Sequence, residues 1–553
     1  MEELKPNAAN SQPLTPLTFL ERASTVYGDS TSIIYNTSTT YTWRETNLRC
    51  LRVASSLSSL GIKRSDVVSV LSANTPAMYE LQFAVPMAGA ILNNVNTRLD
   101  AATVSVLLRH CEAKLLFVDV VYSHLAVEAV EKLEKPPILV LIEEDEEEAG
   151  EDGADVADVS KFCYSYNVLV ETGDPGFKWI RPESEWDPIV INYTSGTTSS
   201  PKGVVHCHRG IFVMSLDSLI DWTVPKNPVY LWTLPIFHAN GWCYPWGIAA
   251  VGGTNVCLRK FQAPLIHRLI RDHGVTHMCG APVVLNMLTS SEVQERLKSP
   301  VHFLTAGSSP PVKVLLRAES LGFVVSHGYG LTEVAGVVVS CAWKLEWNRL
   351  PASERARLKG RQGVRTVGFT EIDVVETGSG RSVERDGVTM GEIVMRGSSV
   401  MLGYFKDPVG TRKSLKNGWF FTGDVGVMHG DGYLEIKDRL KDVIITGGEN
   451  VSSVEVEAVL YTNPVVNEVA VVARGDEYWG ETPCAFVSLR DGLRRKVTEE
   501  EVIEYCREKM PRYMVPKTVV FLDELPKTST GKIPKFLLKE IASKMGSTRL
   551  SRL

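Results

Sequence analysis

The chain has 553 residues, of which 44% are hydrophobic, and a formal net charge of -6 at pH 7. This length exceeds that of one ordinary domain, so we expect roughly two to four units with sizeable cores. The acidic balance excludes a global basic field for nucleic acid, and because no apolar run is long enough to span a bilayer, we do not expect an integral membrane protein.

Strand-like apolar runs alternate with helical patterns through the N-terminal half. Val67–Leu71 precedes a helix expected to start near Pro76, and similar runs are Leu115–Val118, Ile138–Ile142 and His302–Thr305. This alternation indicates parallel β/α layering. The acidic stretch 143–153 predicts a solvated surface loop that needs no function.

The most informative segment follows Ile189–Ile191, which predicts a buried strand. Residues 193–203 are Tyr-Thr-Ser-Gly-Thr-Thr-Ser-Ser-Pro-Lys-Gly, so six of the eleven are Ser or Thr, and Lys202 supplies one cation. Hydroxyls, accessible backbone N–H groups and a point charge together hold a polyphosphate. The common ATPase loop, Gly-x-x-x-x-Gly-Lys-Ser/Thr, is absent. The alternative, a Ser/Thr-rich linker, rarely follows an apolar strand directly.

The pattern changes near residue 365 to short β segments with Gly turns, such as Gly391–Arg396 and Gly432–Lys437. We expect a small β-rich subdomain here and a compact α+β unit after Asp438. The ten cysteines are scattered without a Cys-x-x-Cys pair, which favours structural thiols in a reducing compartment. Met1–Pro6 lack a basic region followed by an apolar one, so we expect no secretory signal.

Five segments, in order, resemble the motifs of the adenylate-forming acyl-activating enzymes, which include acyl-CoA synthetases, aryl-CoA ligases and firefly-type luciferases. Besides residues 193–203 they are Tyr329-Gly-Leu-Thr-Glu333, Thr422-Gly-Asp424, Asp438-Arg-Leu-Lys-Asp442 with Gly447-Gly-Glu-Asn450, and Pro526-Lys-Thr-Ser-Thr-Gly-Lys532. Five matches in the right order are not expected by chance. Ser199 stands where most members have Gly, which stiffens the loop slightly, and we expect nucleotide binding to persist.

The resemblance implies an α/β fold with a large N-terminal domain of layered α/β subdomains plus a small β-rich subdomain. A small, mobile α+β domain follows at the C-terminal side. On this basis residues 1–437 form the adenylation domain, 438–441 the hinge and 442–550 the C-terminal lid.

Such enzymes join a carboxylate to AMP and then pass the acyl group to the thiol of CoA. Adenylation brings two anions together, so charge must be neutralised and the attack aligned. By resemblance, Lys532 bridges the carboxylate and the α-phosphate, Thr332 donates to that phosphate, and Glu333 is a ligand of Mg²⁺, which prefers hard oxygens. The implied cofactors are ATP, Mg²⁺ and CoA; alone, Lys532 could be an ordinary surface lysine.

The resemblance also implies how the nucleotide is held. Tyr329 offers a flat face to adenine, Asp424 accepts the ribose hydroxyls, and Arg439 is a second ribose contact. In isolation, Asp424 is a turn residue and Thr305–Pro311 is a strand–helix turn. The implied nucleotide-binding residues are Thr194, Ser195, Gly196, Thr197, Thr198, Lys202, Gly307, Ser308, Tyr329, Asp424 and Arg439.

Phe237–Trp242 resembles the aromatic gate of the family. His238 would contact the γ-phosphate region in one state, and Trp242 and Trp246 would limit the length of the acyl chain. Core packing is the alternative for these aromatic side chains. His206-Cys207-His208 suggests a metal site, but no further ligands are nearby in sequence and Zn²⁺ sites normally need four.

For the second half-reaction, Lys441 matches the hinge residue of the family. The loop that lines the pantetheine tunnel is implied to contain Gly447, Gly448 and Glu449. Around the hinge, polar side chains and glycines give a permissive backbone for a pivot.

The resemblance is greatest to plant-type peroxisomal acyl-activating enzymes, which implies a short- to medium-chain fatty acid as substrate. A benzoate- or cinnamate-like acid is the alternative. A non-catalytic acyl- or nucleotide-binding protein is disfavoured because Lys202, Glu333 and Lys532 are all present. The tripeptide Ser551-Arg552-Leu553 resembles the Ser-Lys-Leu address read by the peroxisomal import receptor, so we expect a peroxisomal location.

Overall fold

The computed structural model divides by its contacts into two compact units, residues 1–371 with 396–420 and residues 372–395 with 421–553. The predicted fold class is confirmed, with layered α/β structure in the first unit and β-rich and α+β structure in the second. The residues that the structure describes are 5–35, 39–143, 159–194, 202–290, 296–307, 310, 312–447, 449–490, 497–527 and 533–547.

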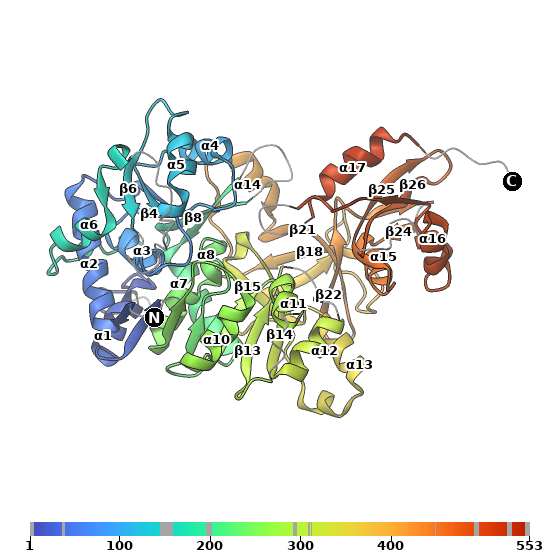
Figure 1. The fold of residues 1–553 in the computed structure, drawn as a ribbon, viewed down its shortest axis with the longest axis horizontal. Helices are drawn as coiled ribbons and strands as arrows, with labels where there is room; N and C mark the ends of the chain where they lie inside the picture. Colours follow the sequence, from blue (N-terminus) through green and yellow to red (C-terminus); the bar gives the residue numbers. More distant parts are fainter. Residues whose placement is uncertain are drawn as a thin grey trace. The chain divides into compact units, whose positions relative to one another are not determined.

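The first unit contains two long sheets, drawn from blue to yellow in Figure 1. One sheet is parallel from β14 to β1 and antiparallel at both edges. Its strands, in spatial order, are β16 (Val364–Arg365), β15 (Gly336–Ser340), β14 (Phe323–Leu331), β13 (Val301–Thr305), β12 (His277–Gly280), β10 (Val229–Leu231), β11 (Thr254–Cys257), β1 (Thr31–Tyr35) and β2 (Thr39–Thr42).

The other sheet is parallel from β8 to β7, and an antiparallel pair of strands extends its edge. Its strands, in spatial order, are β19 (Gly403–Tyr404), β9 (Lys202–Cys207), β8 (Pro188–Thr194), β4 (Ile91–Asn94), β3 (Val67–Leu71), β5 (Leu115–Asp119), β6 (Ile138–Ile142) and β7 (Tyr164–Ser165). The reversal at β8–β9 makes a hairpin of the two strands that flank the predicted phosphate loop.

Helices cover these sheets because parallel strands need crossover connections. They are α1 (Leu17–Val26), α2 (Trp43–Ser59), α3 (Pro76–Met87), α4 (Ala101–Cys111), α5 (Ser123–Val130), α6 (Tyr166–Thr172), α7 (His208–Asp221), α8 (Ala239–Trp242), α9 (Tyr244–Val251), α10 (Ala263–His273), α11 (Pro282–Ser290), α12 (Val312–Leu321), α13 (Ala352–Gly360) and α14 (Pro408–Ser414). Single turns of 3₁₀ helix are η1 (Val120–Tyr122), η2 (Val159–Lys161), η3 (Thr332–Val334) and η4 (Leu345–Arg349).

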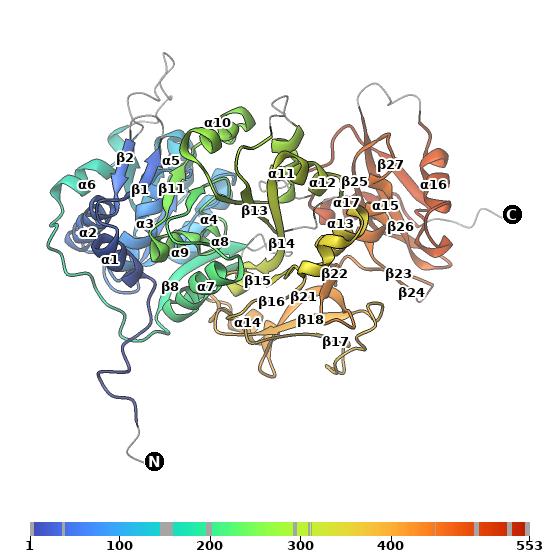
Figure 2. The same ribbon diagram turned by 90° about the horizontal axis from the view of Figure 1, so that it is seen from below.

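Helix α3 is buried on every side from Ala77 to Met87. Its start is fixed by Thr75, whose hydroxyl accepts the Met78 N–H, and by Pro76 at the first helical position. Figure 2 shows α3, α8 and α9 together, and α9 packs on each of the other two. Because α3 is enclosed, the polar side chains that it carries must find protein partners.

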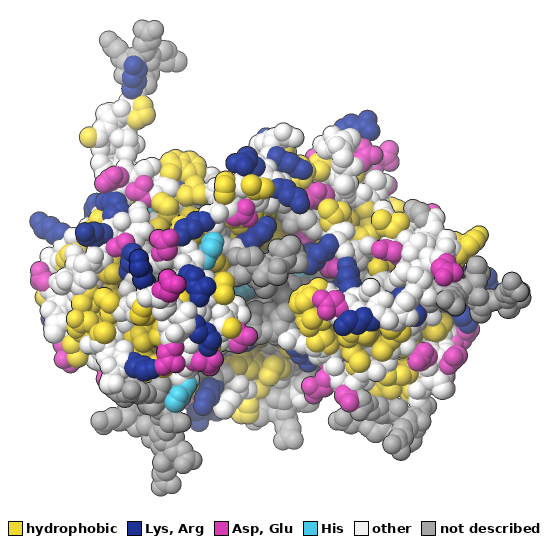
Figure 3. Space-filling model, turned by 90° about the horizontal axis from the view of Figure 1, so that it is seen from above, with side chains coloured by type: hydrophobic (Ala, Val, Ile, Leu, Met, Phe, Trp, Pro, Cys, Tyr) yellow, Lys and Arg dark blue, Asp and Glu magenta, His cyan; other side chains and the backbone are white. Residues whose placement is uncertain are grey.

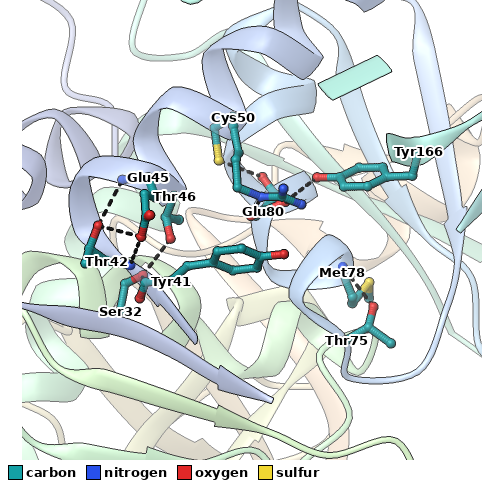
Figure 4. Close-up of polar contacts among 11 residues, drawn as sticks. Ser32, Tyr41, Thr42, Glu45, Thr46, Cys50, Thr75, Met78, Glu80 and Tyr166 are labelled. Carbon is teal, nitrogen blue, oxygen red and sulfur yellow. Dashed lines mark hydrogen bonds and ion pairs between the residues drawn. The ribbon is translucent and has the colours of Figure 1, made fainter. Parts of the chain in front are cut away.

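One such side chain is Glu80, which is fully buried and satisfied (Figure 4). Arg49 of α2 donates two hydrogen bonds to its carboxylate, at 2.5 and 3.2 Å, and the Tyr166 hydroxyl donates a third at 2.6 Å. The guanidinium also lies 4.4 Å from the centroid of the Tyr41 ring. Paired in this way, the buried charge joins α2, α3 and α6.

The second unit contains most of a small sheet in the order β17-β18-β21-β20, with β22 also paired to β21. A second sheet has the order β24-β23-β26-β25, with β27 beside β26. The strands are β17 (Glu371–Val375), β18 (Gly391–Arg396), β20 (Leu415–Lys416), β21 (Trp419–Met428), β22 (Leu434–Arg439), β23 (Ile444–Thr446), β24 (Glu449–Val451), β25 (Val466–Asp476), β26 (Gly480–Leu489) and β27 (Thr518–Phe521).

The helical segments of this unit are α15 (Ser453–Tyr461), α16 (Glu499–Arg507), η5 (Arg512–Met514) and α17 (Lys535–Lys544). The long β25–β26 hairpin carries an apolar cluster on each face. Val456 and Val502, from α15 and α16, pack with Val471 on one face, whereas Leu538 of α17 packs with Phe486 on the other. These clusters give the α+β layering that the sequence predicts after Asp438.

The distribution of charge on the surface agrees with the mixed charge composition of the chain. On the face drawn in Figure 3, Lys and Arg side chains are interspersed with acidic and hydrophobic ones. Among the described residues no helix is both long and apolar enough to cross a membrane. All ten cysteines lie in the described ranges and are free thiols. The predicted acidic loop, apart from Glu143, lies outside the described residues.

Candidate active site

The β8–β9 hairpin places the two ends of the predicted phosphate loop opposite each other. Thr194, the last residue of β8, is in register with Lys202, the first residue of β9. Residues 195–201 lie outside the described residues, and with them the predicted nucleotide contacts Ser195, Gly196, Thr197 and Thr198. The hydroxyl of Tyr193 hydrogen-bonds Nδ1 of His110 at 2.6 Å, which ties this end of the hairpin to α4.

A chain of contacts at the end of that loop joins Lys202, Tyr404 and Glu333. The Lys202 ammonium lies 4.4 Å from the centroid of the Tyr404 ring, a cation–π distance. The Tyr404 hydroxyl donates to Oε1 of Glu333 at 2.9 Å. Burial, followed by the Glu333 charge, raises the pKa of Tyr404, so the phenol stays protonated and keeps donating at neutral pH. The chain links the predicted phosphate lysine with the predicted Mg²⁺ ligand.

The backbone around Thr332 and Glu333 is anchored at two carbonyl groups. The Thr332 carbonyl accepts a hydrogen bond from Nε2 of His206 at 2.7 Å, and the Glu333 carbonyl accepts the Met401 N–H at 2.8 Å. Burial lowers the pKa of His206 to about 4, so the imidazole is neutral and its one N–H points to Thr332. His208, two residues on, contacts the Thr15 hydroxyl instead. The two histidines therefore serve separate structural contacts.

Gly307 and Tyr329 lie at the carboxyl ends of neighbouring parallel strands. The parallel pairing of β13 and β14 ends with Thr305 opposite His327, so Gly307 and Tyr329, each two residues further along, lie at the same edge. Gly307 has φ +93°, which residues with a side chain rarely adopt. The buried Thr305 hydroxyl has no partner among the described residues. Carboxyl edges of this kind bind ligands in open α/β sheets; Ser308 lies outside the described residues.

The predicted gate residues are not equally exposed. His238 is half-buried, Trp242 is buried apart from 7% of its surface, and Trp246 is fully buried. The Trp246 indole N–H donates to the Gln82 carbonyl at 3.2 Å, the environment of a core residue. The amide group of Asn74 bonds the backbone of Trp232, Leu234 and Ile236. Its side chain thus fixes the segment that leads to His238.

In the second unit, the predicted ribose contacts lie side by side. Asp424 of β21 is in register with Arg439 of β22, and their side chains form an ion pair at 2.8 Å. Asp424 is almost completely buried, whereas Arg439 is half-exposed. The Thr422 hydroxyl donates to the Ile393 carbonyl and accepts the Asp424 N–H, which fixes the turn. The motifs that contain Asp424 and Arg439 therefore present their polar side chains next to each other on β21 and β22.

The hinge and loop residues predicted for the second half-reaction also lie in this unit. Lys441 is exposed and follows Asp438, whose carboxylate accepts two hydrogen bonds from Ser453. Gly447 has φ +57°, and a Cβ there would lie 2.6 Å from the Trp479 ring, so only glycine fits. Glu449 is exposed at the start of β24. Gly448 and Lys532 lie outside the described residues.

Sequence reasoning missed Tyr404, His206 and Asn74 as site residues. Tyr404 belongs to a two-residue strand, and its partner Glu333 is 71 residues away, so no local pattern connects them. The sequence pattern His206-Cys207-His208 suggests only a metal ligand. Among the described residues no group of three His, Cys, Asp or Glu side chains could hold a metal ion.

A divalent cation held mainly by nucleotide phosphates needs one or two carboxylates beside them. Glu333 provides such a carboxylate, half-buried and oriented by Tyr404, and the Thr332 hydroxyl adds a neutral oxygen. These residues fit Mg²⁺ with a nucleotide. In the first unit, cations and hydroxyls suited to phosphates thus occur with a carboxylate suited to Mg²⁺. The second unit by itself presents a carboxylate–guanidinium pair suited to a diol.

Known proteins share this organisation. The family model described as "AMP-binding enzyme" matches residues 20–405, and "AMP-binding enzyme C-terminal domain" matches residues 455–532. Probable acyl-activating enzyme 5, peroxisomal, of Arabidopsis thaliana is 78% identical over 100% of both chains. The 2-methylpropanoate–CoA ligase CCL4 of Humulus lupulus is 65% identical over 99% of this chain and 98% of its own.

Among solved structures, the anthranilate CoA ligase AuaEII in complex with anthranoyl-AMP has a TM-score of 0.82 at 23% identity. The match covers 97% of this chain and 99% of that one. At this identity the likeness establishes the fold.

Proposed function

The chain belongs to the family of AMP-binding enzymes and is an ATP-dependent acid–CoA ligase, and we propose that its acid is a short- to medium-chain fatty acid. The enzyme uses ATP, Mg²⁺ and CoA. A carboxylate oxygen attacks the α-phosphorus of ATP, acyl-AMP forms and pyrophosphate leaves. The sulfur of CoA then attacks the acyl carbon, and AMP leaves. Bound Mg²⁺ supplies positive charge beside the phosphates.

The Lys202–Tyr404–Glu333 chain is the observation that carries the nucleotide half of this proposal. It places a cation and a carboxylate on one tyrosine, beside a Ser/Thr-rich loop. In the proposed roles, Lys202, the backbone of Gly196 and the hydroxyls of Thr194, Ser195, Thr197 and Thr198 hold the phosphates. Thr332 donates to the α-phosphate. Tyr329 stacks on adenine, while Asp424 and Arg439 hold the ribose. Lys532 bridges the carboxylate and the α-phosphate.

The size of the acid is proposed from two observations. Trp242 is a bulky, almost fully buried side chain four residues after His238, and in the proposed role it limits the length of the acyl chain, whereas Trp246 packs in the core. In addition, a relative at 65% identity is named for 2-methylpropanoate, a short branched acid. A benzoate-like acid is the alternative that the assay below separates.

For thiolation, residues 438–441 are the proposed hinge between an adenylation domain (1–437) and a C-terminal lid (442–550). Lys441 would be the pivot, and Gly447, Gly448 and Glu449 would line the path of the pantetheine arm. Gly447 supports this role because its close approach to the Trp479 ring leaves a narrow loop without a side chain.

The test is release of AMP and pyrophosphate by purified protein with ATP, Mg²⁺, CoA and a panel of straight-chain, branched and aromatic acids. The highest kcat/KM is expected for a short or medium fatty acid, and Lys532→Ala should lower kcat by about 10²–10³-fold, as for other preorganised charge-stabilising groups. A maximum on an aromatic acid would contradict the substrate. Absence of AMP with every acid would instead indicate a non-catalytic binding protein.

A peroxisomal location is proposed from Ser551-Arg552-Leu553, which lie outside the described residues, and from the relative named peroxisomal. An import receptor would bind this tripeptide. A fluorescent protein fused to the N-terminus should appear in peroxisomes of plant cells and in the cytosol after deletion of residues 551–553. The same distribution for both fusions would contradict the proposal.

A further inference from the structure

The gate carries an unusual backbone. Consecutive residues lie in the left-handed region of φ: Ala239 (41°), Asn240 (44°), Gly241 (52°), Trp242 (53°) and Cys243 (66°). For residues with a Cβ this conformation is unfavourable and normally occurs singly. A run of this length persists only if surrounding contacts determine it, and such strain is concentrated at functional sites.

Side-chain amides from three other elements supply those contacts. Asn192 of β8 donates to Oδ1 of Asn240 at 2.6 Å, and Asn240 donates to Oε1 of Gln82 at 2.9 Å. Asn94 of β4 donates to the same Gln82 oxygen at 3.0 Å. We call these four residues the amide relay. Every member is buried, so its hydrogen bonds do not compete with water.

The relay has a defined direction. An amide group can donate and accept at the same time. Asn240 accepts a hydrogen bond from Asn192 and donates one to Gln82. Gln82 sends its own N–H groups to the Met78 carbonyl at 3.0 Å and to Asn94 at 3.4 Å. An apolar replacement would leave buried partners unsatisfied. The Oδ1 atom of Asn192 is buried without a partner among the described residues.

The relay and the turn connect the gate to the nucleotide site. Asn192 lies two residues before Thr194, where the phosphate loop begins, and Asn240 lies two residues after His238. At the other end of the turn, the Cys243 thiol contacts the Ala335 carbonyl at 3.2 Å. Ala335 caps the C-terminal end of η3, which carries Glu333. The left-handed turn is therefore fastened on both sides to segments that flank the predicted nucleotide contacts.

We propose that Asn240, held by Asn192 and Gln82, is a positioning residue for the carboxylic acid substrate, an inference that rests on the proposed function. The relay fixes the left-handed turn, and the turn sets where His238 and Trp242 stand beside the acyl group. Asn192 couples this arrangement to the strand that leads into the phosphate loop. Precise placement of the acid matters because small misplacements from a near-attack geometry cost large factors in rate.

The test compares Asn240→Gly and Asn192→Ala with the wild type. Glycine accepts the left-handed backbone but removes the amide, so Asn240→Gly isolates the relay from backbone strain. Each variant should lower kcat/KM for the acid by about 10- to 100-fold and alter the preference for acyl-chain length, while KM for CoA stays within about two-fold. Because both residues act in one relay, the double variant should be little worse than the poorer single variant.

Asn93→Ala is the matched control. Asn93 is also a buried asparagine of β4, but it bonds Ser69 and Cys111 and takes no part in the relay. This variant should lower Tm yet keep the acid kinetics and the chain-length preference of the wild type. If the relay variants lower Tm as Asn93→Ala does and also leave the acid kinetics and chain preference unchanged, the relay is structural only and the proposal is wrong.

The acid used is whichever the wild type converts best, so an unexpected substrate does not affect this test. If the wild type releases no AMP with any acid, the proposed function fails separately. The relay is then tested by the shift in Tm that the acids produce. A shift in the wild type that is lost in Asn240→Gly supports positioning of the acid, whereas no shift in the wild type overturns it.

Discussion

At the scale of single residues, Tyr404 brings together two charges of opposite sign. Its ring lies under the Lys202 ammonium and its hydroxyl donates to Glu333, so one side chain orients both groups. A hydrogen bond to a charged group contributes about 1.5–3 kcal/mol, more than a neutral one. Loss of the hydroxyl alone should therefore disturb Glu333 and leave the cation–π contact in place.

Tyr404→Phe tests this arrangement. We expect kcat/KM for ATP to fall by about 10- to 100-fold, with a higher Mg²⁺ concentration needed for half-maximal rate, because the carboxylate loses its orienting donor. Equilibrium binding of Mg²⁺-ATP should weaken in parallel. Tyr461→Phe is the control, since that hydroxyl contacts the Val469 carbonyl in the second unit. Wild-type dependence on ATP and Mg²⁺ in Tyr404→Phe would show that the hydroxyl is dispensable.

At the scale of elements, the bounds of several strands can be predicted from the local pattern of apolar residues. Ile138–Ile142 and Gly391–Arg396 are observed as β6 and β18 with the predicted bounds, because apolar runs flanked by turns leave few alternatives. The predicted strand at Gly432–Lys437 begins two residues later, at Leu434, since Gly432 takes a turn conformation with φ +83°. The left-handed turn at 239–243 could not be predicted. Neither Ala239 nor Trp242 favours positive φ, and the relay that holds them comes from distant strands.

The paired strands β21 and β22 allow a sharp test of the ribose contact. Asp424 and Arg439 lie in register across the strands, so the Thr-Gly-Asp and Asp-Arg-Leu motifs meet although 14 residues separate their key side chains. If Asp424 binds the ribose hydroxyls, Asp424→Ala should raise KM for ATP by about 10-fold or more. The variant should also lose the preference of the wild type for ATP over 2′-deoxy-ATP.

Discrimination between the two nucleotides is the decisive readout, because a purely structural Asp424 would not affect it. Arg396→Ala in β18 is a suitable control, since Arg396 pairs with Glu371 in an exposed ion pair. It should keep the nucleotide preference. Equal discrimination in Asp424→Ala and in the wild type would place the ribose elsewhere.

At the scale of the whole molecule, buried neutral histidines predict an acid limit to stability. Burial lowers the pKa of His206, His208 and His277 to about 4. In the unfolded chain these groups have pKa values near 6.5, so between pH 6.5 and 4 the unfolded state binds more protons. These histidines therefore do not reduce the free energy of unfolding above pH 6.5. As pH decreases below this value the free energy of unfolding falls, by up to about 3 kcal/mol for each histidine near pH 4.

Tm measured from pH 7.5 to 5 should decrease in the wild type and decrease less in His208→Asn, which removes one titrating group. His124→Asn, at an exposed position of α5, should keep the slope of the wild type. A pH slope in His208→Asn as steep as that of the wild type would mean that His208 is not held neutral in the folded protein.

The family and the reaction class could also be predicted from sequence, and the comparisons confirm both. Five motifs suffice to predict the family and the reaction class, because each lies in a segment where the reaction requires particular residue types. The boundaries at 437 and 442 stay a prediction, since contacts group residues 372–395 with 421–553. The acid itself could not be predicted, because the depth of an acyl pocket depends on packing among residues such as Trp242, Trp246 and Gln82.

The central claim is that the acid is activated as acyl-AMP, and isotope transfer tests it most directly. The enzyme would be given acid labelled with ¹⁸O in its carboxylate, together with ATP, Mg²⁺ and CoA, and the products analysed by mass spectrometry. Attack of the carboxylate on the α-phosphorus leaves its oxygen in the bridge, so the released AMP should carry one ¹⁸O and the pyrophosphate none. Label in pyrophosphate or inorganic phosphate, with unlabelled AMP, would contradict the account.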